Sequence, residues 1–166
     1  DGCYRFNLRA FPAQLPGVLA VSALGPMSWA YDFGTNLDRL ASYSNYGQSA
    51  IAFAGPGGDT PLFGTPEGSA GCTVGGLLRA CYVFDLVFAS GGYTATGNSY
   101  YWVAGTSMAA PHVSGVAALI IGKHGGELAP AEVERILRAS SDDLGKPGVD
   151  DAYGSGRVNA VRAVTY

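Results

Sequence analysis

The sequence predicts an α/β fold with a mostly parallel sheet. Short apolar runs typical of buried strands alternate along the chain with longer runs of helical periodicity, and strands separated by helices usually pair in parallel. The composition is that of a globular protein, because the 166 residues are 48% hydrophobic and only 14% charged. This length is enough for one domain with a sizeable core.

The first 24 residues predict a surface loop followed by a strand. Residues 1–16 show no helical pattern and contain the pairs Phe11-Pro12 and Leu15-Pro16. Residues 17–24, which read Gly-Val-Leu-Ala-Val-Ser-Ala-Leu, form an apolar run between turn residues. Such a run is typical of a buried strand.

Turn residues dominate 25–48, and a second strand is predicted at 49–54, where small and large residues alternate. The sequence Gly-Pro-Gly-Gly at 55–58 is expected to end it. Asp59 follows directly. A lone carboxylate here could face a cation, but after two glycines we expect a solvated turn residue.

Two cysteines lie in the next stretch, and their spacing suggests a disulfide. Only eight residues separate Cys72 from Cys81. A zinc site is the competing interpretation, but with Cys3, His112 and His124 as the remaining candidates the chain offers no complete ligand set. We therefore expect a bond between Cys72 and Cys81, which indicates an oxidising, extracellular setting.

Residues 81–89 and 99–104 are rich in β-branched and aromatic residues and should be strands. The second leads into a turn, Gly105 and Thr106, and then into an apolar run from Ser107 to Gly122 that predicts a helix. This run has no continuous polar face, so we expect the helix to be buried, with Pro111 within its first turn.

Ser107 stands at the predicted start of that helix. Unpaired backbone N–H groups and the positive end of the helix dipole would lie beside its hydroxyl, where a developing oxyanion is stabilised. This placement suggests a nucleophile, although serine before an apolar run often only caps a helix.

Two further helices are expected near the carboxyl end. After Gly125-Gly126, residues 130–138 begin with proline and place apolar residues at positions i, i+3 and i+4, which predicts an amphipathic surface helix. Residues 154–164 contain a Gly-x-Gly-x-Val-Asn-Ala sequence before a short apolar run.

Residues 105–115 read Gly-Thr-Ser-Met-Ala-Ala-Pro-His-Val-Ser-Gly. This string closely resembles the nucleophile motif of the subtilisin-like serine proteases, Gly-Thr-Ser-Met-Ala-x-Pro-His-Val-x-Gly. Residues 11–21 resemble the family's aromatic-proline tract, whose aromatic-proline bond is commonly cis, and residues 154–160 resemble its closing segment. The resemblance implies a three-layer sandwich in which this chain supplies the carboxyl-terminal part.

By the same resemblance, Ser107 is the nucleophile of a peptide-bond hydrolase. The Ser107 backbone N–H and the Thr106 hydroxyl would meet the oxyanion, and Met108 would lie on the leaving-group side. Residues 60–92 are longer than the family's usual connection, so we expect an insertion there that carries the Cys72–Cys81 loop.

The base and acid of a catalytic triad are not evident in the sequence. His112 lies about 140° around the helix from Ser107, and His124 is about 25 Å away along it, so we expect a core histidine and a helix cap respectively. No Asp has the family's Asp-Ser-Gly or Asp-Thr-Gly setting, and Asn7 lies too near Phe11 for the oxyanion asparagine. We expect residues 1–166 to be the carboxyl-terminal portion of a peptidase domain whose Asp, His and Asn lie on a separate amino-terminal part.

The predicted function is therefore a secreted serine endopeptidase whose partners are that amino-terminal part and protein or peptide substrates. A noncatalytic protease-like binding or structural domain is the alternative. No cofactor is required, and a structural calcium ion is compatible with the family, although no acidic cluster specifies a site. The net charge of −3 and the lack of Lys/Arg clusters argue against nucleic acid, and no apolar run is long enough for a bilayer.

Overall fold

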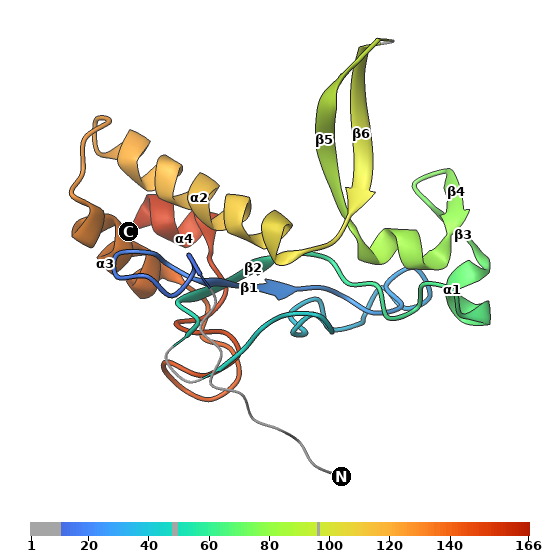
Figure 1. The fold of residues 1–166 in the computed structure, drawn as a ribbon, viewed down its shortest axis with the longest axis horizontal. Helices are drawn as coiled ribbons and strands as arrows, with labels where there is room; N and C mark the ends of the chain where they lie inside the picture. The colour runs from blue at the N-terminus through green and yellow to red at the C-terminus, as the bar shows by residue number, and fades with distance from the viewer. Residues whose placement is uncertain (1–10, 48–49, 96) are drawn as a thin grey trace.

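A parallel pair of strands forms the centre of the molecule. The computed structural model describes residues 11–47, 50–95 and 97–166 (Figure 1). Strand β1 (Val21–Leu24) pairs with β2 (Phe53–Pro56) so that Val21 lies opposite Phe53. The strand predicted at 49–54 is thus displaced, because Gly55 and Pro56 continue the pairing instead of ending it. Residues 1–10, which include Cys3 and Asn7, lie outside the described residues.

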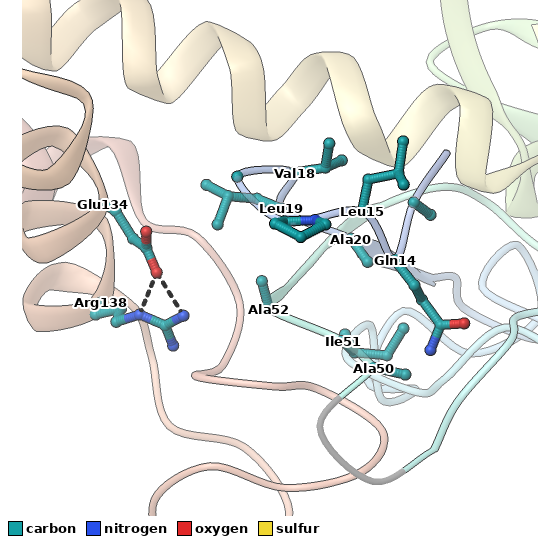
Figure 2. Close-up of a pocket in the computed structure, with 13 residues that line it drawn as sticks. Gln14, Leu15, Val18, Leu19, Ala20, Ala50, Ile51, Ala52, Glu134 and Arg138 are labelled. Atoms are coloured by element: carbon teal, nitrogen blue, oxygen red, sulfur yellow. Dashed lines mark hydrogen bonds and ion pairs between the residues drawn. The ribbon is translucent and has the colours of Figure 1, made fainter. Parts of the chain in front are cut away.

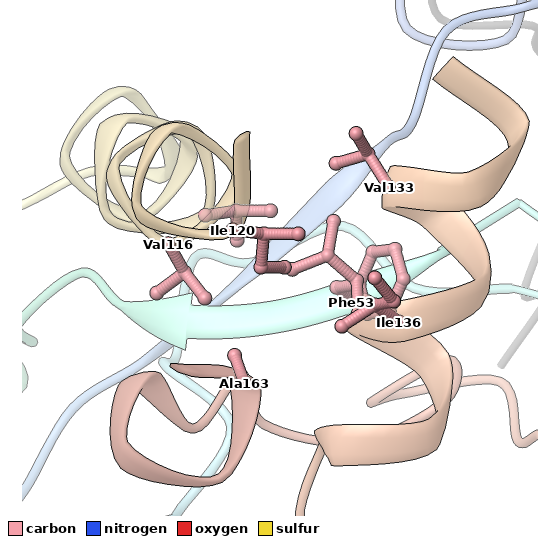
Figure 3. Close-up of a cluster of buried hydrophobic side chains, with 8 residues drawn as sticks. Phe53, Val116, Ile120, Val133, Ile136 and Ala163 are labelled. Atoms are coloured by element: carbon pink, nitrogen blue, oxygen red, sulfur yellow. The ribbon is translucent and has the colours of Figure 1, made fainter. Parts of the chain in front are cut away.

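Three helices pack around this pair: α2 (Thr106–Lys123), α3 (Pro130–Ser140) and α4 (Ala160–Thr165). Their apolar side chains meet around Phe53, which is fully buried (Figure 3). The cluster contains Phe53, Val113, Val116, Ile120, Val133, Ile136, Leu137 and Ala163. The helices predicted at 107–122 and 130–138 are therefore confirmed, and the last helix begins at Ala160 after an Asn159 cap.

Helix α2 departs from its prediction in two respects. Only one face is buried, by Ala109, Val113, Val116 and Ile120, while the opposite face is exposed and includes Leu119, which is 52% exposed. The prediction of a fully buried helix is wrong for the described residues, because β1, β2, α3 and α4 cover one side only. Pro111 is the sixth helical residue rather than a first-turn residue.

The segment after β2 forms a separate lobe, at the end of the molecule opposite α3 in Figure 1. It contains α1 (Pro66–Ser69) and an antiparallel hairpin of β3 (Gly71–Val74) and β4 (Leu77–Ala80). The predicted disulfide between Cys72 and Cys81 is present. The predicted strand at 81–89 is wrong in its first half, because Cys81–Asp85 form a 3₁₀ helix that buries Phe84 against the disulfide.

A second hairpin leads into α2. Strands β5 (Val87–Thr94) and β6 (Gly97–Val103) pair antiparallel and project from the body (Figure 1). Of the three strand pairs among the described residues only β1–β2 is parallel, so the mostly parallel sheet is not confirmed.

The Phe11-Pro12 peptide bond is cis, as predicted. The insertion at 60–92 and the three-layer arrangement stay predictions.

Replacing both cysteines, Cys72→Ala with Cys81→Ala, should lower the free energy of unfolding by roughly 2.5 to 3 kcal/mol on the loop-entropy model. The bond closes a loop with a sequence separation of 9 residues and lies in a small apolar cluster. Denaturant titration of the oxidised protein and the double variant measures the difference. Reductant should shift the denaturation midpoint of the wild-type protein and leave that of the double variant unchanged, which would assign the stabilisation to this bond. Equal free energies of unfolding for the oxidised wild-type protein and the double variant would contradict the prediction.

Candidate functional site

Ser107 lies in the first turn of α2, where β6 has just ended. Gly105 is the residue that caps the helix, and the N–H groups of Met108 and Ala109 donate to its carbonyl at 2.9 and 3.3 Å. Ser107 itself is exposed. The prediction that Ser107 stands at the start of a helix is therefore confirmed.

The Ser107 N–H has no acceptor among the residues that the structure describes. It is one of the first N–H groups of an 18-residue helix, whose positive dipole end adds to its partial charge. A negatively charged oxygen at this point would be stabilised by both. Thr106 is the first helical residue and Met108 the third, so the turn residues singled out by the sequence lie together.

The turn is tethered to the carboxyl ends of both central strands. The Gly105 N–H donates to the Gly57 carbonyl at 2.9 Å. The N–H groups of Gly57 and Gly58 in turn donate to the Leu24 carbonyl at 2.7 and 3.0 Å. A side chain at Gly57 is excluded, because its Cβ would lie 2.5 Å from that of Ala23 and 2.9 Å from the Gly105 oxygen.

Asp59 is the largest departure from the sequence prediction near this site. It is fully buried, whereas a solvated turn residue was expected. Its carboxylate accepts from the Ser42 hydroxyl at 2.6 Å, the Ser42 N–H at 2.9 Å and the Thr60 N–H at 2.8 Å, with an Arg39 guanidinium nitrogen at 3.6 Å. These donors compensate the buried charge. Asp59 therefore fixes the chain after β2 to the loop at 42.

Tyr43, the next residue of that loop, was not identified from the sequence. Its hydroxyl lies 2.9 Å from the Gly57 carbonyl and 2.7 Å from the Gly58 carbonyl. Burial, with a smaller contribution from the charge of Asp59, raises the pKa of Tyr43 to about 12. The phenol thus remains a hydrogen-bond donor at neutral pH. The contact of Tyr43 with Gly57 is evident only in the structure, because the two residues are 14 positions apart in the chain.

Each of the two histidines contacts a backbone carbonyl of α2. The His112 Nδ1 lies 2.8 Å from the Met108 carbonyl, and the residue is exposed, so the expected core histidine is wrong. His124 ends α2, and its Nδ1 lies 2.8 Å from the Ile120 carbonyl, which confirms the predicted cap. The sequence contains only these two histidines.

A cavity of about 490 Å³ opens beside the nucleophile turn, between β5 and the start of α2. Met108 lines it together with Phe88, Pro111 and His112. The Phe88 ring stacks on that of Tyr100 at 5.3 Å, so one wall is aromatic. The cavity thus borders on the residue that follows Ser107.

A hollow of about 520 Å³ lies at the opposite, amino ends of β1 and β2 (Figure 2). Residues 13–20 and 50–52 line it together with Glu134 and Arg138 of α3. The Glu134 carboxylate is held by the Arg138 guanidinium at 2.7 Å. Because the Glu134 carboxylate is already paired with Arg138, this hollow does not resemble a cation site.

No group of three or more metal-ligating side chains gathers within the described ranges. Likewise, none of the helices described is both long and apolar enough to cross a bilayer. Calcium binding stays a prediction.

Comparison with known proteins gives consistent matches along the chain. The model of the subtilase family matches residues 6–156. Halolysin of Haloferax mediterranei is 33% identical over 156 residues, which are 94% of this chain and 21% of that protein. An extracellular serine protease of Serratia marcescens is 30% identical over 93% of this chain and 13% of its own length. The crystal structure of a lanthipeptide protease superposes with a TM-score of 0.67 and 31% identity, over 93% of this chain and 44% of that chain.

Proposed function

This chain belongs to the subtilase family of serine proteases, and we propose that it supplies the nucleophile, Ser107, of an endopeptidase that hydrolyses protein or peptide chains. The chain spans only about a fifth of the length of halolysin. The observation that supports the proposal is the exposed Ser107 in the first turn of α2, whose N–H has no acceptor among the described residues.

The proposed reaction has two steps. The Ser107 Oγ bonds to the carbonyl carbon of the peptide, its proton passes to a histidine nitrogen, and the C–N bond breaks as that proton moves to the leaving amine. Water then cleaves the acyl ester and restores the hydroxyl. The Ser107 N–H stabilises the oxyanion of each tetrahedral intermediate, assisted by the Thr106 hydroxyl and an asparagine from outside the chain.

We infer that the histidine comes from outside these 166 residues, because His112 and His124 each contact a backbone carbonyl of α2. We therefore propose an amino-terminal part that carries the Asp, the His and the oxyanion Asn. The exposed face of α2 supports this proposal, since it carries apolar residues, Ala118 and Leu119 among them, that a partner could cover.

We further propose that the protein is secreted. The Cys72–Cys81 disulfide fits an oxidising compartment, and the Serratia marcescens relative is named as an extracellular protease. A structural calcium ion remains compatible with the family, without a ligand set among the described residues.

Hydrolysis of a fluorescently labelled protein substrate tests the proposal. The chain alone should be inactive, and activity should appear when the amino-terminal part is present in the same preparation, which intact-mass analysis identifies. An assembly that binds the labelled substrate but never cleaves it would favour the noncatalytic alternative. Activity of the chain alone would contradict the assignment of the base to another part.

A further inference from the structure

We propose that Tyr43 is a positioning residue whose hydroxyl holds the nucleophile turn in place through the Gly57 and Gly58 carbonyls. The inference rests on the proposed function of Ser107 and deepens it. It concerns a residue 64 positions before Ser107 whose hydroxyl contacts the backbone after β2 and lies within hydrogen-bonding reach of the Gly105 backbone.

The two glycines that follow β2, Gly57 and Gly58, are held through both their N–H groups and their carbonyls. Their N–H groups, those of Gly57 and Gly58, both donate to the Leu24 carbonyl. Their carbonyls converge on the Tyr43 hydroxyl, at 2.9 and 2.7 Å. One phenol proton is shared between the two acceptors, and rotation of either peptide group would lengthen one of these contacts.

The Gly57 carbonyl also accepts the Gly105 N–H at 2.9 Å. A movement of this carbonyl therefore moves Gly105, which caps α2 and stands two positions before Ser107. Small displacements of a nucleophile are costly to catalysis, because the reacting atoms must meet within a few tenths of an ångström. The contact between Tyr43 and Gly57 thereby acts on Ser107 without touching substrate.

Tyr43 is itself fixed on both sides. The N–H and hydroxyl of Ser42 donate to the buried Asp59 carboxylate, and the Ser44 hydroxyl accepts the Ala23 N–H at 3.0 Å. Tyr43 is 38% exposed as a residue, while its hydroxyl contacts the Gly57 and Gly58 carbonyls. Burial and the nearby Asp59 charge raise its pKa to about 12, which keeps the phenol protonated over the pH range of an assay.

The test is Tyr43→Phe in the active assembly, with Tyr46→Phe as the matched control. Tyr46 is 72% exposed and lies in the same loop. We expect Tyr43→Phe to lower kcat about tenfold while KM changes less than twofold, and Tyr46→Phe to change neither. Amide exchange at Gly105, measured by NMR, should be several-fold faster in Tyr43→Phe only.

A residue with a merely structural role would lower the melting temperature and leave kcat unchanged in the folded protein. Wild-type kcat in a folded Tyr43→Phe assembly would therefore overturn the inference. If the wild-type assembly hydrolyses no peptide, the proposed function fails instead. Amide exchange at Gly105 then tests the inference on its own. An unchanged rate in Tyr43→Phe would overturn the proposal that Tyr43 holds the nucleophile turn, and a faster rate would support it.

Discussion

Replacing Ser107 with alanine is expected to lower kcat for peptide hydrolysis by about 10⁴-fold or more, the range established for serine proteases such as subtilisin that lose their nucleophile. The variant keeps the backbone N–H groups of the turn, so only the residual rate from substrate binding and oxyanion contacts should remain. Steady-state kinetics of the assembled protein measure the loss.

Ser114→Ala is the matched control on the same helix. Ser114 is also exposed, and its hydroxyl donates to the Ala110 carbonyl at 3.1 Å within α2. This variant should retain kcat within twofold. An assembly that keeps its rate after Ser107→Ala would show that another group attacks the substrate.

Phe53→Ala is expected to destabilise the fold by about 3 to 5 kcal/mol, the range for truncating a buried aromatic residue. Phe53 is fully buried on β2, where α2, α3 and α4 meet, and the Arg138 guanidinium lies 5.4 Å from its ring centre. The side chain joins all three helices to the central strands, so its removal leaves a cavity that no single neighbour can fill.

Urea denaturation of the assembled protein measures this change. Phe33→Ala serves as the control, because Phe33 is 62% exposed and makes an edge contact with Trp29 alone among the ring pairs described. Its effect should stay below about 1 kcal/mol. Equal losses at both positions would contradict the placement of the core around Phe53.

The helices were predictable from sequence because their signals are local. The run 107–122 is predominantly apolar and contains no Asp, Glu, Lys or Arg, and the run 130–138 repeats apolar residues with helical spacing. The cysteine pair was likewise readable from its short loop, and the bond is present. In each case neighbouring residues determine the conformation, with little influence from distant contacts.

The features that sequence reasoning missed depend on distant partners. Asp59 can be buried because Ser42, 17 positions earlier, donates to its carboxylate and Arg39, 20 positions earlier, forms an ion pair with it. Gly55 is a paired residue of β2. Only glycine fits there, because a Cβ at this position would lie 2.9 Å from the Ala109 oxygen. Nothing within a short window of sequence distinguishes these residues from ordinary turn residues.

Part of the site was predictable for a related reason. The position of Ser107 at a helix start follows from the adjacent turn and apolar run, and the structure places it there. Its connection to Tyr43 through Gly57 joins three segments that are far apart in the chain. The sequence therefore identified the nucleophile candidate but not the contacts that position it.

Mapping of a fluorophosphonate adduct tests the central proposal most directly, because the probe bonds to an activated serine and ignores an unactivated hydroxyl. Peptide mass analysis of the labelled assembly should place one adduct on Ser107, with none on the separated chain and none after Ser107→Ala. An adduct on a different serine of the assembly, or strong labelling of Ser107 in the purified chain alone, would contradict the account.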